Sequence, residues 1–120
     1  NYYEPRLSPD GPAMGGAILA VLAARAGKPL RAYKMFQKSY QLNELPPFNV
    51  IAETSVGTNP YFATGAGGML QAALFGLGGL DIQSDGVKQL PSKRHKAWES
   101  LTLKGIGKNE MTFTRCVKVV

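Results

Sequence analysis

The stretch from Ala13 to Ala26 constrains the fold most, because almost every residue in it is apolar and Arg25 is its only charged side chain. A proline-containing segment precedes it, in which Ser8 or Asp10 is suited to cap a helix. Gly27 follows as a C-terminal cap. A helix that is apolar on every face is expected to be covered on every face. The sequence therefore predicts a helix buried on all sides.

Two further helices are predicted, and they differ in pattern. In residues 30–41 apolar side chains recur at helical spacing, at Leu30, Tyr33, Phe36 and Tyr40, while basic residues point elsewhere. Residues 65–75 begin with glycines and are apolar on nearly every face. A buried helix paired with an amphipathic one is what concentric inner and outer rings of helices require.

From Leu80 onward the apolar pattern changes to a period of two. Residues 80–82 and 87–90 flank a turn signal at 84–86, and residues 101–106 and 111–119 flank a second turn at 107–109. These segments predict antiparallel strands with one buried face. We expect an α+β chain with a helical portion over residues 1–78 and an antiparallel β domain over residues 79–120.

Charge and cysteine content exclude several classes of protein. The net charge of +6 is spread thinly, apart from a small basic cluster at residues 93–96, so a nucleic-acid partner is not expected. The single Cys116, in an alternating apolar run, predicts a buried structural thiol and excludes an internal disulfide. The lone His95 has no neighbouring ligands, so neither a metal nor an organic cofactor is expected.

Features of targeting are also missing from the sequence. It contains no signal peptide and no apolar run approaching twenty residues, so we expect a soluble protein without a membrane partner. The first residues, Asn1 to Arg6, include no initiator methionine, and we interpret the chain as a fragment. Its compartment stays open, and a periplasmic or cytoplasmic bacterial enzyme is compatible with the sequence.

The segment between the second and third predicted helices is the candidate site. Residues 43–64 show little regular pattern, and long loops inside compact domains tend to be functional. Glu53 is the only carboxylate between Asn49 and Leu80, and the glycine-rich helix start at Thr64–Gly68 follows it. A helix start offers unpaired N–H groups to a polar ligand. The alternative is that Glu53 is solvated and that the glycines only permit close helix packing.

Four segments together resemble glycoside hydrolase family 65. They are the N-terminal Tyr-Tyr-Glu-Pro-Arg at residues 2–6, the glycine-rich stretch 62–71, the glycine turn 76–80 and the Trp-Glu-Ser-Leu stretch 98–101. Their order and spacing match over essentially the whole chain. The resemblance implies the last helices of an (α/α)6 barrel followed by an antiparallel β C-terminal domain, and a family that cleaves α-linked glucosides with inversion.

The resemblance also implies a hydrolase-type variant. Phosphorylases of the family carry a phosphate-binding His and Ser, where this chain has Phe62 and Gly65. Glu53 stands where a hydrolase would place the general base that activates water. The general acid would lie outside these residues, so we expect the chain to be inactive alone. Glu4 and Arg6 are interpreted as structural residues, either as an ion pair or at the rim of the site.

Further site residues and partners follow from the same resemblance. We expect substrate contacts from Asn59, Tyr61, Thr64, Gly65 and Gly67. The expected partners are an oligosaccharide or disaccharide substrate and the remainder of the same enzyme chain, and the full enzyme could form a homodimer. Two alternatives stay open: a phosphorylase that uses phosphate, and a non-catalytic carbohydrate-binding or structural fragment.

Overall fold

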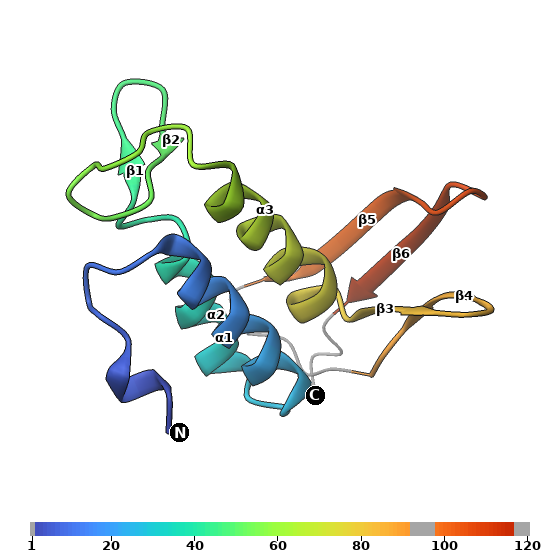
Figure 1. Ribbon diagram of the computed structural model, residues 1–120. Coiled ribbons are helices and arrows are strands. Elements are labelled where there is room, and N and C mark those ends of the chain that lie inside the picture. The colour runs from blue at the N-terminus through green and yellow to red at the C-terminus, as the bar shows by residue number, and fades with distance from the viewer. Residues whose placement is uncertain (1, 92–97, 117–120) are drawn as a thin grey trace.

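A computed structural model describes residues 2–91 and 98–116 of the chain as a small α+β structure (Figure 1). The helical segments are η1 (Glu4–Arg6), α1 (Ala13–Arg25), α2 (Pro29–Lys38), α3 (Ala63–Gln71) and η2 (Ala72–Leu77). The strands are β1 (Glu44–Leu45), β2 (Val50–Ile51), β3 (Leu80–Gln83), β4 (Gly86–Gln89), β5 (Ser100–Ile106) and β6 (Met111–Cys116). The helices and the two longer hairpins occupy opposite sides of the molecule (Figure 1).

Helix α1 ends as the sequence predicts but begins differently. Gly27 adopts a φ of 69°, and the N–H groups of Gly27 and Lys28 donate to the carbonyls of Ala24 and Ala23. This pair of bonds is the Schellman arrangement, in which glycine satisfies the last carbonyls of a helix. At the other end Pro12 is the N-cap and no side chain caps the helix, so the predicted cap by Ser8 or Asp10 is wrong.

Small residues bring the helices into close contact. A Cβ atom added to Gly16 would lie 3.0 Å from the Met35 carbonyl oxygen of α2. On the α3 side, a Cβ on Gly68 would lie 3.2 Å from that of Ala17. Alanines of α1 and α2 accordingly supply about half of the buried hydrophobic residues in the described part of the chain. Helices α1 and α3 lie side by side and run in the same direction (Figure 1).

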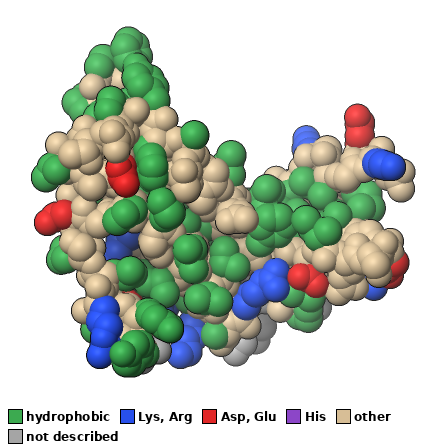
Figure 2. All heavy atoms as spheres, in the orientation of Figure 1, with side chains coloured by type: hydrophobic (Ala, Val, Ile, Leu, Met, Phe, Trp, Pro, Cys, Tyr) green, Lys and Arg blue, Asp and Glu red, His purple; other side chains and the backbone are tan. Residues whose placement is uncertain are grey.

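The predicted burial of α1 on all sides is wrong for the described part of the chain. Ile18 is 56% exposed and Leu22 is 58% exposed, because α2 and α3 cover only the alanine-rich face. Leu30, which the helical spacing placed on the buried face of α2, is also 56% exposed. Ala32 and Met35 form that face instead. Figure 2 shows hydrophobic side chains at the surface of the helical part.

The third predicted helix continues through η2 to Leu77, beyond its predicted end near Phe75. The turns of η2 widen to a π-helix, and the Gly78 N–H donates to the Ala73 carbonyl at 2.7 Å. Such π-helical segments are rare and short. The wider turns keep Gly76 against the backbone of Val21, where a Cβ would lie 3.1 Å away. Apolar periodicity could not predict this change of winding.

The loop expected over residues 43–64 contains a short hairpin. Glu44 pairs with Ile51 and Leu45 with Val50, and the Pro46–Pro47 peptide bond is cis. The two prolines concealed this hairpin in the sequence, because proline is usually read as a strand breaker.

The two longer hairpins follow the predicted turns. Strand β3 pairs with β4 around the turn at Ser84 and Asp85, and β5 pairs with β6 with a register shift between Leu103 and Ile106. Trp98 joins the β portion to the helices, because its ring meets those of Tyr33 and Phe36 edge to face at 5.7 and 5.9 Å.

Several predictions lie outside the described residues. These are the basic cluster at 93–96 with His95, the strand extension over 117–119 and the surroundings of the Cys116 side chain. Within residues 2–91 and 98–116, no helix is long and apolar enough to cross a membrane. The same residues contain no cluster of His, Cys, Asp and Glu side chains suited to hold a metal ion.

Candidate active site

The candidate site is a closed loop at the N-terminal ends of α1 and α3 (Figure 1). The Phe62 N–H donates to the Ile51 carbonyl at 2.7 Å and so joins the two ends of the loop. Inside it, the Glu53 N–H donates to the Thr58 carbonyl at 2.9 Å, and the hydroxyls of Thr54 and Thr58 are 2.6 Å apart. Loops whose ends meet in this way are compact and are often functional.

Asn43, which precedes the loop, fixes the backbone position of Glu53. Its side chain is 3% exposed, and Nδ2 donates to the carbonyls of Ala52 at 3.2 Å and Glu53 at 2.8 Å. The Glu53 carbonyl also accepts the first N–H of α1, from Ala13 at 3.1 Å. Glu53 is therefore held by its backbone at the start of α1. Sequence reasoning missed Asn43, and an asparagine in a loop gives no signal of this role.

The Glu53 carboxylate is held as well. The side chain is half-buried, and Asn59 Nδ2 donates a hydrogen bond to Glu53 Oε2. Among the described residues, this is the only side-chain hydrogen bond to that carboxylate. The structure thus brings two predicted site residues together, and it orders a carboxylate at the surface of the loop.

The other predicted substrate contacts fall into two groups. Tyr61, Thr64 and Gly67 are exposed around the start of α3, and a Cβ on Gly67 would meet no heavy atom within 4 Å. Gly65 is buried, and a Cβ atom added there would lie 3.1 Å from Ala13 Cβ and 3.1 Å from Ile51 Cγ2. The first group leaves room for a ligand. Gly65 serves close packing in the described chain.

Phe62 and Gly65 lie against each other at the start of α3. A Cβ on Gly65 would be 3.0 Å from Phe62 Cδ1, which is tighter than ordinary van der Waals contact. Phe62 is the N-cap residue of this helix, and no side chain hydrogen-bonds to the helix end. The phenyl ring therefore lies against the first turn of α3 at Gly65.

The surroundings of the N-terminal segment differ from the prediction. Glu4 forms an ion pair with Arg31 of α2, so the predicted pair of Glu4 with Arg6 is wrong. The Arg6 guanidinium instead lies over the Tyr2 ring at 3.8 Å. A cavity of about 380 Å³ lies between this segment and the helices, and its apolar lining includes Leu7, Pro9, Pro12, Met14, Leu19, Met35 and Leu42. None of the predicted site residues lines this cavity.

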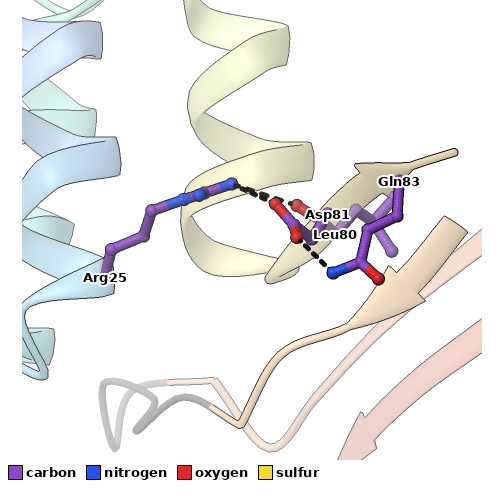
Figure 3. Close-up of polar contacts among 4 residues, drawn as sticks. All are labelled: Arg25, Leu80, Asp81 and Gln83. Carbon is purple, nitrogen blue, oxygen red and sulfur yellow. Dashed lines mark hydrogen bonds and ion pairs between the residues drawn. The ribbon is translucent and has the colours of Figure 1, made fainter.

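A polar contact at the other end of α1 ties the helix to the β portion (Figure 3). Arg25 bonds to the Asp81 carboxylate at 3.2 Å, and Gln83 Nε2 donates to the other carboxylate oxygen at 3.0 Å. The Gln83 hydrogen bond is the largest cause that lowers the pKa of Asp81, and Arg25 lowers it further. Desolvation opposes both effects.

Comparison with known proteins shows that the chain is related to glycoside hydrolases. It is 48% identical over 113 residues to the kojibiose hydrolase of Mucilaginibacter mallensis and 48% identical over 114 residues to that of Flavobacterium johnsoniae. Each alignment covers 93% of this chain and 17% of the relative. The protein-glucosylgalactosylhydroxylysine glucosidase of Mus musculus is 42% identical over 86 residues, covering 71% of this chain and 12% of the relative.

These relatives are much longer than the chain, which spans about a sixth of the kojibiose hydrolases that it matches. No protein-family model matches the chain.

Proposed function

We propose that the chain is the C-terminal part of an inverting glycoside hydrolase of the family 65 type, in which Glu53 activates the attacking water. The observation that carries this proposal is the ordered Glu53 carboxylate on its closed loop, in a chain 48% identical to enzymes named hydrolases. The substrate class is an α-linked glucose disaccharide or a related glucoside, as the name kojibiose hydrolase suggests.

The surroundings of Glu53 suit a general base. Its backbone is fixed at both N–H and C=O, so the carboxylate extends from a rigid support. Asn59 donates to Oε2, which leaves Oε1 to accept a proton from water. A general base has to lie within hydrogen-bond reach of the proton that it removes, so a water bonded to Oε1 is the required reactant.

The proposed reaction needs a second carboxyl group. Water attacks the anomeric carbon as Glu53 takes its proton, the glycosidic C–O bond breaks, and a general acid protonates the leaving oxygen. In inverting enzymes the two carboxyl groups lie about 6.5–9.5 Å apart, which leaves room for the water. We place the general acid outside these residues, in the remainder of the enzyme, and therefore expect the 120-residue chain alone to be inactive.

The start of α3 favours water over phosphate as the nucleophile. A serine at position 65 would bring its Cβ within 3.0 Å of the Phe62 ring, so this pair of residues offers neither a hydroxyl nor an imidazole to phosphate. The Glu53 carboxylate would also repel a phosphate anion. Both features act against a phosphorylase.

The same proposal assigns the two portions of the chain. Residues 1–78 would supply the last helices of an (α/α)6 barrel, and residues 79–120 would belong to its C-terminal β domain. Tyr61, Thr64 and Gly67 would line the sugar site from the exposed start of α3, and Gly65 would act there through its backbone at most. A homodimer of the full enzyme stays a prediction.

The full-length enzyme provides the test. We expect it to hydrolyse kojibiose in phosphate-free buffer, at a rate that added phosphate does not raise, and to release β-glucose first, as observed by NMR spectroscopy. Strict dependence on phosphate, with formation of glucose 1-phosphate, would instead establish the phosphorylase. Binding of glucosides without any turnover would establish a non-catalytic carbohydrate-binding protein.

A further inference from the structure

Asn59 adopts a backbone conformation that needs an explanation. Its φ is 46°, in the left-handed region, where glycine is the least strained residue and asparagine is the best tolerated of the others. The residue follows Thr58, whose carbonyl accepts the Glu53 N–H, so the loop returns Asn59 to the side of Glu53. A glycine would serve the turn alone. Asparagine tolerates the same backbone and in addition supplies a side-chain amide.

The Asn59 amide makes a hydrogen bond to the candidate base. Asn59 Nδ2 donates to Glu53 Oε2, and the amide is neutral, so it orients the carboxylate without neutralising its charge. A free glutamate side chain loses up to about 2 kcal/mol of rotamer entropy when it is fixed. Because Asn59 is part of the closed loop, this entropy is lost on folding and not when the substrate binds.

We infer that Asn59 is a positioning residue for the Glu53 carboxylate, which it holds by Oε2 so that Oε1 faces the reacting water. This inference rests on the proposed function of Glu53. It changes the role expected from the sequence, in which Asn59 contacts the sugar directly. Tyr61, with a φ of 62° and an exposed ring, stays available for that contact.

The test uses the full-length enzyme with Asn59→Gly, which accepts the left-handed backbone and removes the amide. We expect kcat on kojibiose to fall about 10–100-fold, as when a reacting group is misplaced by about 1 Å, with KM essentially unchanged. Asn49→Gly is the matched control, because Asn49 is exposed and also left-handed, with a φ of 54°. That variant should keep both constants.

A double-mutant cycle with Glu53→Gln separates positioning from a general structural effect. When the base is absent, Asn59→Gly should cause no further loss of kcat, because the group that it orients is gone. An equal loss in both backgrounds would overturn the inference, as would a raised KM with kcat unchanged, which indicates a sugar contact.

The same cycle distinguishes failure of the role of Asn59 from failure of the proposed function of Glu53. If Glu53→Gln abolishes turnover and Asn59→Gly has no effect, the inference about Asn59 fails and the proposed function stands. If Glu53→Gln keeps the rate of the unmodified enzyme, the proposed function fails, and the positioning role fails with it.

Discussion

The buried amide of Asn43 donates to the Glu53 carbonyl at 2.8 Å and so joins the segment that follows α2 to the loop of the candidate site. A second hydrogen bond runs in the opposite direction, because the Ala52 N–H donates to the Asn43 carbonyl at 2.8 Å. A single side chain that is 3% exposed therefore sets where the loop begins its turn. The position of the candidate base therefore depends on a buried residue outside the loop.

Asn43→Asp is expected to destabilise the enzyme and to lower its activity together. The substitution keeps the shape of the side chain but turns a donor into an acceptor that faces two carbonyl oxygens. Such an unmade buried bond costs about 1–3 kcal/mol. Thermal unfolding of the full-length enzyme should show a lower midpoint. Asn109→Asp, in the exposed β5–β6 turn, is the control and should leave the midpoint almost unchanged.

The glycines of the helices give a second, matched pair. A Cβ at Gly16 would lie 2.9 Å from the Ser39 nitrogen and 3.0 Å from the Met35 carbonyl oxygen, and neither backbone atom can move easily. Gly16→Ala should therefore cost about 1–3 kcal/mol through overpacking. Gly67→Ala meets no atom within 4 Å and should instead stabilise the enzyme, by up to about 1 kcal/mol. Equal effects of the two on the unfolding midpoint would contradict the described packing.

Elements defined by local sequence signals were predicted correctly, and contacts between distant residues were not. Local signals predicted well: the apolar run ending at Gly27 gave α1, and the turn at Ser84 and Asp85 gave the β3–β4 hairpin. Signals that depend on distant partners failed. Nothing in the sequence indicates that Ala13 takes its cap from the Glu53 carbonyl, or that Glu4 pairs with Arg31.

The candidate site shows the same division. Glu53 stood out because it is a lone carboxylate on a long loop, and the structure places Asn59 beside it. Asn43 contacts Glu53 only in the folded loop, so composition and periodicity could not predict this contact. Burial of α1 was overestimated because an apolar face in the sequence does not tell which element covers it.

The acid response of the enzyme should include a contribution from Asp81. The pKa of this carboxyl is lowered in the folded state, chiefly by the Gln83 hydrogen bond and then by Arg25. Its stabilising effect is therefore present above the ordinary pKa of an aspartate, about 3.9, and is lost as the pH falls through the lower folded value. Asp81→Asn should reduce the unfolding midpoint at pH 7 and make progressively less difference below about pH 4.

A control for that experiment lies in the neighbouring turn. Asp85 pairs with Lys88 at 2.8 Å, but both side chains are more than half exposed. Exposed pairs of this kind contribute little to stability. Asp85→Asn should therefore leave the unfolding midpoint unchanged at pH 7. An effect of Asp81→Asn that is the same at pH 7 and at pH 3 would contradict the assigned role of the Asp81 contacts.

The exposed face of α1 tests whether the chain functions inside a larger enzyme. If the remainder of the enzyme covers Leu22, which is 58% exposed here, Leu22→Ser should destabilise the full-length enzyme by about 2–5 kcal/mol. The exposed Lys104 of β5 provides a comparison, and Lys104→Ser should stay within about 0.5 kcal/mol. A Leu22→Ser variant as stable as the unmodified enzyme would show that this face stays in water.

The role of Glu53 is tested most directly by chemical rescue of the full-length Glu53→Ala variant. Loss of a general base should lower kcat on kojibiose about 10²–10⁴-fold. Azide needs no base to attack, so added azide should restore turnover and yield β-glucosyl azide, the product of inversion. Full activity of Glu53→Ala without azide, or an inactive variant that azide does not rescue although it is folded, would contradict the assignment of Glu53 as the residue that activates water.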